Sequence, residues 1–175
     1  MVGCDLTSQG GIASVVKCLY SEAERTGTVD YTLVKTTDYK HGTRLTNLLV
    51  FAGCLLRILV AMPSTDIVHL QASSHVSFYR KHLVFFLARL WRKPVVWHLH
   101  ASRFSEFFIM AQGIRRRMID VAFRSSDLVL VLCDLFRTQL AESYGLKNVQ
   151  VLRNPIASAT PGRSASEAVV RREPA

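Results

Sequence analysis

Residues 94–99 read PVVWHL, and residues 128–132 read LVLVL. Both runs are continuous, apolar and rich in valine, which is typical of strands that are covered on both faces. A helical pattern at residues 114–124 lies between them. Because buried strands that alternate with helices form parallel sheets, the two runs predict an α/β domain.

The same alternation continues outward from these two strands in both directions. It predicts a Rossmann-like, doubly wound parallel sheet with helices on both faces. The expected strands cover residues 1–4, 31–35, 66–70, 94–99, 128–132 and 149–152, and the expected helices cover residues 11–25, 44–61, 75–92, 114–124 and 134–144.

Three helix ends carry capping signals. Ser73 or Ser74 is expected to cap the helix that precedes Lys93 and Pro94, and Asp134 the helix that follows residues 128–132. Gly145 is expected just past the end of that last helix, in the left-handed conformation that glycine adopts easily.

Size and composition indicate one domain. The chain has 175 residues and is 49% apolar, enough to bury a core. We assign residues 1–156 to the domain and residues 157–175, which are low in complexity, to a disordered tail. The short first strand and the abrupt change after the last one suggest a piece of a longer protein.

The net charge of +9, from 22 basic and 13 acidic residues, favours an anionic partner. No nucleic-acid motif is present, so we expect no nucleic acid. Arg115, Arg116 and Arg117 form the densest basic run, and we interpret it as an acceptor or membrane surface. Solvated helix faces are the alternative interpretation of the basic residues.

Localisation is inferred from the cysteines and from one apolar run. Cys4, Cys18, Cys54 and Cys133 form no paired motif, which predicts free buried thiols in a reducing cytoplasm. No secretory signal is visible. Residues 45–62 are strongly apolar, but Asn47 and Arg57 interrupt them, so we favour a buried or interfacial helix over a membrane-spanning one.

A glycine-containing segment, Ser8 to Gly11, lies between the first expected strand and helix. Gly10 and Gly11 would let backbone amides approach an anion at the positive end of the helix. A tight turn that uses glycine for conformational reasons explains the segment equally well.

His98 and His100 lie at the end of the strand at residues 94–99. Because side chains alternate along a strand, the two share one face. No third ligand has a recognisable spacing, so we expect no metal. We expect His100, where the strand opens into a loop, to hydrogen-bond a substrate hydroxyl or phosphate. Residues 66–75 form another strand end that leads into a helix.

Taken in order, five segments resemble the N-terminal half of the family-four (group 1) GT-B glycosyltransferases. The segments are SQGGIASVVK (8–17), DIVHLQASSHVSFYRK (66–81), KPVVWHLHASRFSEFF (93–108), SDLVLVLCD (126–134) and VQVLRNPI (149–156).

The resemblance implies a domain that helps to transfer a sugar from a nucleotide-sugar to a glycan or lipid-linked acceptor, in polysaccharide biosynthesis for example. It implies that Gly10 and Gly11 face the donor diphosphate and that His100 is the catalytic-site histidine near the donor sugar. It implies no metal and no cofactor, and often a peripheral position on the cytoplasmic face of the membrane.

The second, donor-binding domain of that family is absent from these 175 residues. We therefore expect the chain alone to be inactive, and a separate donor-domain subunit is a candidate partner. The alternative hypothesis is a non-catalytic Rossmann-like binding module tethered to a membrane or to a partner.

Overall fold

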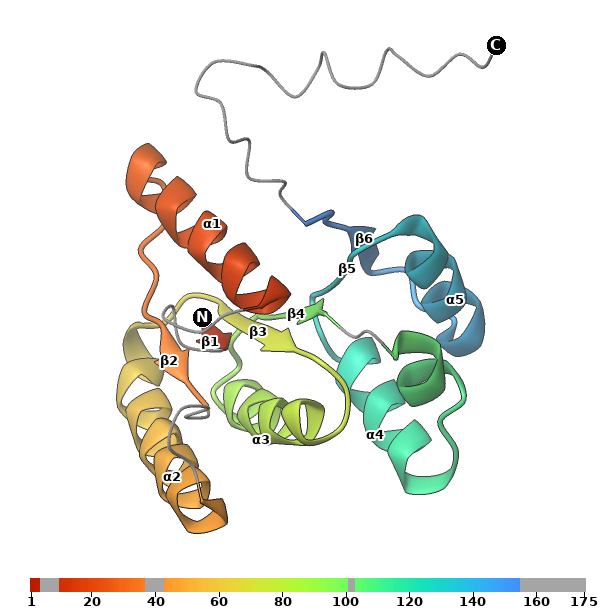
Figure 1. Ribbon diagram of the computed structural model, residues 1–175, viewed down its shortest axis with the longest axis horizontal. Helices are drawn as coiled ribbons and strands as arrows, with labels where there is room; N and C mark the ends of the chain where they lie inside the picture. The colour runs from red at the N-terminus through yellow and green to blue at the C-terminus, as the bar shows by residue number, and fades with distance from the viewer. Residues whose placement is uncertain (4–9, 37–42, 101–102, 155–175) are drawn as a thin grey trace.

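A six-stranded parallel sheet forms the centre of the protein, with the strand order β2-β1-β3-β4-β5-β6 (Figure 1). The structure is a computed structural model that describes residues 1–3, 10–36, 43–100 and 103–154. The strands are β1 (Val2–Gly3), β2 (Val34–Lys35), β3 (Val68–Ala72), β4 (Val95–Leu99), β5 (Leu128–Val131) and β6 (Val149–Val151). All five neighbouring pairs are parallel, which confirms the predicted Rossmann-like α/β fold.

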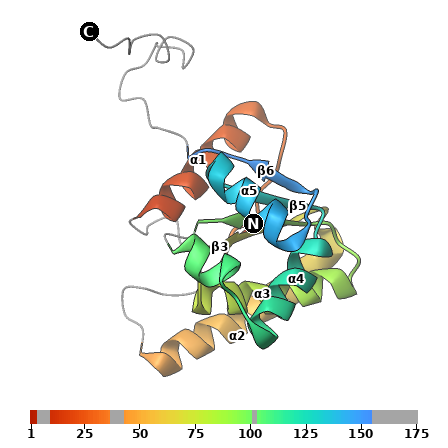
Figure 2. The same ribbon diagram turned by 90° about the vertical axis from the view of Figure 1, so that its right-hand side faces the viewer.

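Helices cover the two faces of the sheet unequally. Helix α1 lies on one face, whereas α2, α3 and α4 lie on the other (Figures 1 and 2). The helices are α1 (Gly11–Thr26), α2 (Arg44–Ala61), α3 (Val76–Leu90), α4 (Gly113–Arg124) and α5 (Asp134–Tyr144), with a 3-10 turn η1 (Met62–Ser64) and a π-helical turn η2 (Ser105–Ile109). The sequence did not predict η2.

An aromatic core fills the space between the sheet and helices α3, α4 and α5. Trp97 of β4 is fully buried, and its ring lies 5.3 Å from that of Phe78 and 5.8 Å from that of Phe123, between ring centroids. Leu140 and Tyr144 of α5 belong to the same core. Each such aromatic side chain removes a large apolar area from water, so this layer supplies most of the burial that holds the fold.

Arginines of α4 fasten the end of α5. The guanidinium of Arg116 donates to the backbone carbonyl of Ser143, and that of Arg124 donates to the carbonyl of Tyr144. Because the last carbonyls of a helix lack partners within it, cations at this end satisfy them and the helix dipole together.

Two of the three predicted caps are wrong. Strand β3 extends to Ala72, so α3 begins only at Val76, with His75 at its N-cap and no side-chain cap. Asp134 is the first residue of α5 rather than its cap, and its carboxylate pairs with Arg137 and Arg153. Gly145 ends α5 in the left-handed conformation, at φ 62°, as predicted.

The cysteine prediction also needs correction, because only Cys54 is buried among the described cysteines. Cys18 is exposed on α1 and Cys133 is half-buried. The predictions for Cys4, for the segment that begins at Ser8, as far as residue 9, and for the tail at 157–175 lie outside the described residues.

Candidate functional site

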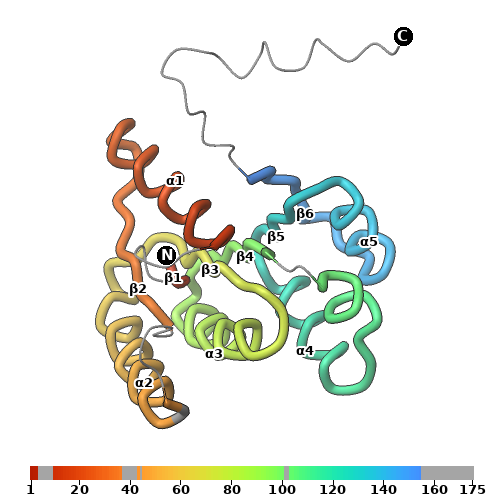
Figure 3. Tube along the Cα trace, in the orientation of Figure 1, coloured from red at the N-terminus to blue at the C-terminus, as the bar shows by residue number. Residues whose placement is uncertain are grey.

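The candidate site lies at the edge of the sheet where the parallel strands end. From β1 the chain moves outward to β2 through α1 and then returns past β1 to β3 through α2 (Figure 3). The strand order therefore reverses between β1 and β3. In open α/β sheets, ligands bind outside the carboxyl ends of the strands at such a reversal.

Two glycines open helix α1 at this edge, as the sequence predicted. Gly10 is the N-cap, and its φ of 127° is strained for any residue with a side chain. Gly11 has an ordinary φ. Among the described residues, no atom lies within 4 Å of a Cβ placed on either glycine. Gly10 is thus required by the backbone, whereas the structure gives no steric reason for Gly11.

The first turn of α1 is electrostatically suited to an anion. It contains no acidic residue, and no described side chain caps its amides. The only side chain that folds back on the turn is Ser14, whose hydroxyl donates to the carbonyl of Gly10 at 3.2 Å, among the described residues. The partial positive charge of the helix end is therefore left without a counter-charge from its own first turn.

His98 and His100 share one face of β4, as predicted, with ring centroids 4.0 Å apart. The side chain of His98 is fully buried. Neither of its ring nitrogens has a hydrogen-bond partner among the described residues. Buried polar atoms without partners are uncommon and destabilising, so this ring is not explained by stability.

Sequence reasoning missed two further members of the site, His69 and Gln71 of β3. Gln71 pairs in register with His98, and the His69 ring stacks on the His98 ring at 5.7 Å. The same alternation that identified His98 and His100 is present in β3, where His69 and Gln71 alternate with Val68 and Leu70. We name His69, Gln71, His98 and His100 the histidine cluster.

The amide of Gln71 joins two of the imidazoles. Its Oε1 lies 2.6 Å from Nε2 of His100, and its Nε2 lies 3.1 Å from Nε2 of His69. An amide oxygen only accepts, so His100 donates from Nε2, and the lone pair of its neutral ring is at Nδ1. His69 correspondingly accepts at Nε2. Gln71 therefore selects one tautomer for each of the two rings.

Burial keeps the three imidazoles neutral. It lowers the pKa of His98 to about 2, with smaller contributions from His100 and His69. Burial likewise lowers the pKa of His69 and of His100 to about 4. A neutral His100 suits a hydroxyl ligand better than a phosphate, because it brings no positive charge. No group of three or more potential metal ligands occurs in the described part of the chain.

A hollow of about 280 Å³ lies at the start of α3 on the same edge. Hydroxyls and cations line it, from Ser73, Ser74, Ser77, Arg80 and Lys81, together with His75 and Val76. Lys81 is buried and its Nζ donates to Oγ1 of Thr36 at 2.8 Å. A polar or anionic group is the chemistry that such a lining accommodates.

Two of the three arginines at 115–117 also make contacts within the protein. The Arg116 guanidinium lies over the ring of Tyr144, 3.7 Å from its centroid, and that of Arg115 lies over Phe107 at 5.4 Å. Both side chains are half-buried, and Arg117 is exposed. A surface role for the three arginines stays a prediction.

Comparison with known proteins finds no matching family model and no matching curated protein. The fold defines the class instead: a Rossmann-like α/β domain, with a polar hollow at the start of α3.

Proposed function

We propose that this chain is the acceptor-side domain of a GT-B glycosyltransferase of the family-four type. With a donor domain, it would transfer a sugar from a nucleotide-sugar to a glycan or lipid-linked acceptor. One observation carries the proposal: the first turn of α1, opened by Gly10 and Gly11, and the neutral His100 share the switch-point edge of the sheet.

The chemistry of glycosyl transfer fits this pairing. The leaving diphosphate gains negative charge, which the amides and the dipole of α1 stabilise. Nδ1 of His100, left unprotonated by the bond to Gln71, accepts a hydrogen bond from a sugar hydroxyl and orients the sugar. The hollow at the start of α3 would receive a polar part of the acceptor.

The test is a nuclear magnetic resonance titration of the full chain with uridine and guanosine diphosphate-sugars and with inorganic pyrophosphate. We expect saturable shifts of the amides of Gly11 and Ile12, lost in Gly11→Val and kept in the control Gly53→Val, since Gly53 lies in α2 and has equal space. Shifts that are absent or unaffected by Gly11→Val would contradict the proposal.

Activity is tested by adding a donor-domain chain to this one. We expect sugar transfer only in the mixture, and we expect His100→Ala to reduce it. Transfer that is indifferent to His100 would remove this residue from the catalytic site.

A second candidate is a non-catalytic binding module held at the cytoplasmic face of a membrane. Helix α2 favours it, because the residues from Leu45 to Ser64 have a mean hydropathy of 2.1 and only 17% of the most apolar window is buried. In that case His100→Ala and Gly11→Val would leave function intact.

A further inference from the structure

Helix α2 exposes an apolar stripe on the side that faces away from the sheet. Its core side is formed by Cys54 and Ile58, which are buried. On the outer side, Leu56 is 65% exposed and Val60 is 82% exposed. A helix that packs on a sheet normally presents polar residues to water on this side, so α2 departs from the ordinary amphipathic pattern.

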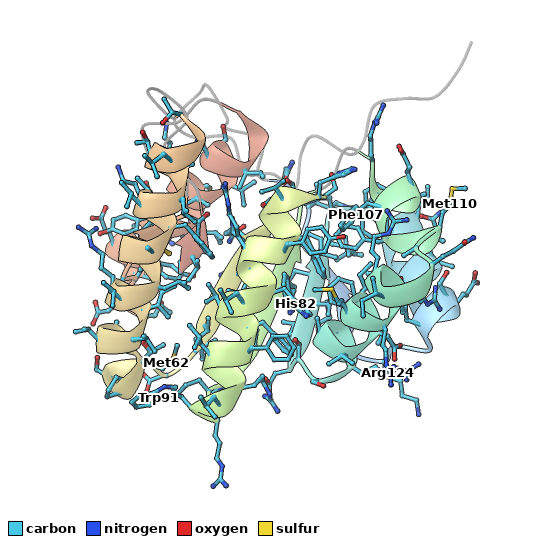
Figure 4. The ribbon with its side chains drawn as sticks, turned by 90° about the horizontal axis from the view of Figure 1, so that it is seen from below. Met62, His82, Trp91, Phe107, Met110 and Arg124 are labelled. Carbon is cyan, nitrogen blue, oxygen red and sulfur yellow. The ribbon has the colours of Figure 1, made fainter. Side chains whose placement is uncertain are left out.

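Helix α3 continues the exposed apolar surface. The two helices lie side by side in one layer (Figure 4). The guanidinium of Arg80 of α3 lies 6.0 Å from the ring centroid of Phe51 of α2. We name the surface the apolar face, and its main members are Leu48, Leu56 and Val60 of α2 and Leu83, Phe86 and Leu90 of α3.

Basic residues predominate around the apolar face. Residues 44–93, which contain both helices, hold seven lysine and arginine residues and a single acidic residue, Asp66. Lys81 is buried and Arg89 of α3 pairs with the exposed Asp127 at 3.5 Å, so the basic excess at the surface is smaller than this count. Arg57 is exposed next to Leu56, and Arg92 is exposed next to Trp91 at the end of α3. Apolar side chains flanked by arginine suit an anionic lipid surface, where the chains enter the acyl boundary and the guanidinium groups reach the headgroups.

We propose that the apolar face docks onto an anionic lipid bilayer, with α2 and α3 lying in the plane of its interface. This deepens the membrane location proposed above by assigning it to α2 and α3 rather than to residues 115–117. It does not depend on sugar transfer.

The topology argues against a membrane-spanning α2. This helix connects β2 to β3, and β1 pairs with both of these strands. A spanning helix would place β2 and β3 on opposite sides of the membrane and break the sheet.

Two protein occupants of the apolar face are disfavoured by charge and composition. A second copy of the chain would bring two basic surrounds together, and like charges oppose such an interface. The segment at residues 157–175 has Val169 and Val170 as its only large apolar residues, too few to cover the face.

Sedimentation of the full chain with lipid vesicles tests the proposal. We expect binding to vesicles of phosphatidylcholine with phosphatidylserine, and weaker binding to phosphatidylcholine alone or at high salt. The double variant Leu56→Gln/Val60→Gln should lower the partition at least about tenfold. Tenfold corresponds to about 1.4 kcal/mol, less than the burial of one large apolar side chain.

Leu135→Gln is the matched control, because Leu135 of α5 is 61% exposed and lies outside the apolar face. It should bind vesicles as the wild type does. Arg57→Glu should weaken binding to the anionic vesicles and leave binding to phosphatidylcholine unchanged.

Tryptophan fluorescence gives a second readout in the same protein. Trp91, at the end of α3, is 43% exposed and projects near Met62 in the view of Figure 4. Trp97 is fully buried. Vesicles should therefore shift the emission of Trp91 to the blue, and Trp91→Phe should abolish the shift.

Three results would overturn the proposal: no sedimentation with either vesicle, binding that the double variant leaves intact, or a dimer of the free chain that the double variant dissociates. Gly11→Val should bind vesicles normally. Vesicle binding without diphosphate binding would therefore reject the transferase proposal alone, and the reverse result would reject the docking proposal alone.

Discussion

Trp97 and His98 are adjacent in β4 and both are fully buried, yet they face opposite sides of the sheet and opposite surroundings. Trp97 packs against the rings of Phe78, Phe85 and Phe123, although its single polar side-chain atom, Nε1, also has no hydrogen-bond partner among the described residues. His98 lies between His69 and His100, with neither ring nitrogen hydrogen-bonded among the described residues.

The aromatic face of β4 contributes to the stability of the fold, whereas the opposite face holds the candidate functional groups. On the aromatic face, burial lowers the free energy of the folded state, because apolar area leaves water. On the face of the histidine cluster, burial removes three imidazoles from water. Gln71 hydrogen-bonds two of them, whereas both nitrogens of His98 lack a partner among the described residues. A face that is stabilised by another layer can hold such groups, and strongly shifted pKa values are typical of functional sites.

The largest expected effect is a contrast between substitutions on the two faces. Trp97→Ala should lower the free energy of unfolding by about 3–5 kcal/mol, since it leaves a large cavity in the core. His98→Leu should leave it unchanged or raise it, because it removes unsatisfied nitrogens. Urea denaturation measures both. If His98→Leu lowered the free energy of unfolding as much as Trp97→Ala does, both faces of β4 would contribute equally to stability and the distinction would fail.

Acid should destabilise the protein through the histidine cluster. The folded pKa of His98, about 2, is below the ordinary 6.5, so the unfolded chain takes up the proton first as the pH falls. Stability is therefore lost below pH 6.5, at about 1.4 kcal/mol per pH unit for this ring. Urea denaturation at a series of pH values gives the free energy of unfolding as a function of pH. Below pH 6.5, this free energy should fall less steeply in His98→Leu than in the wild type, by about 1.4 kcal/mol per pH unit. An unchanged slope would contradict the assignment.

Gln71→Glu should sharpen the role of the amide. A carboxylate beside His100 and His69 favours their charged forms and should raise the pKa of His100 by about 1–3 units. Imidazole chemical shifts followed by pH titration would show this. Gln150→Glu, at an exposed position in β6, is the control and should leave that pKa unchanged.

The smallest effects concern the two glycines at the start of α1. Gly10→Ala should cost about 1–2 kcal/mol, because its backbone conformation disfavours a side chain. At Gly11, an alanine side chain has space and the backbone φ is ordinary. The free energy of unfolding of Gly11→Ala should therefore match that of the wild type within about 0.5 kcal/mol, as measured by urea denaturation. Equal losses at both positions would show that Gly11 is structural.

Periodicity was sufficient for the long elements of the fold. The predicted bounds of the helix at 44–61 match α2, and the predicted strands at 94–99 and 128–132 match β4 and β5 within one residue. The expected strand at 31–35 shortens to two residues in β2. The cap expected at Ser73 or Ser74 failed because β3 extends two residues further than predicted and α3 starts later. Asp134 failed differently: β5 ends at Val131, α5 begins at Asp134 itself, and Cys133 occupies the N-cap position.

Only those members of the candidate site were predicted that a pattern within one strand or at one helix start identifies. Alternation within β4 pairs His98 with His100, and the glycines precede the first helix. Alternation within β3 likewise places His69 and Gln71 on one face, but only the register of β3 against β4 places Gln71 opposite His98. The exposure of α2 likewise depends on tertiary packing, because an apolar helix can have the same sequence whether or not other elements cover it.

The pairing of β1 with β3 has a consequence for synthesis. Val2 is opposite Leu70, a residue 68 positions later. At ribosomal rates of about 5–20 residues per second, roughly 3–14 seconds separate the synthesis of β1 from that of β3, the later of its two neighbours in the sheet. The apolar helix α2 emerges within that interval, before the strand that anchors it. The nascent chain is thus most prone to aggregation while this helix is exposed, and a chaperone or a nearby bilayer would be of most use then.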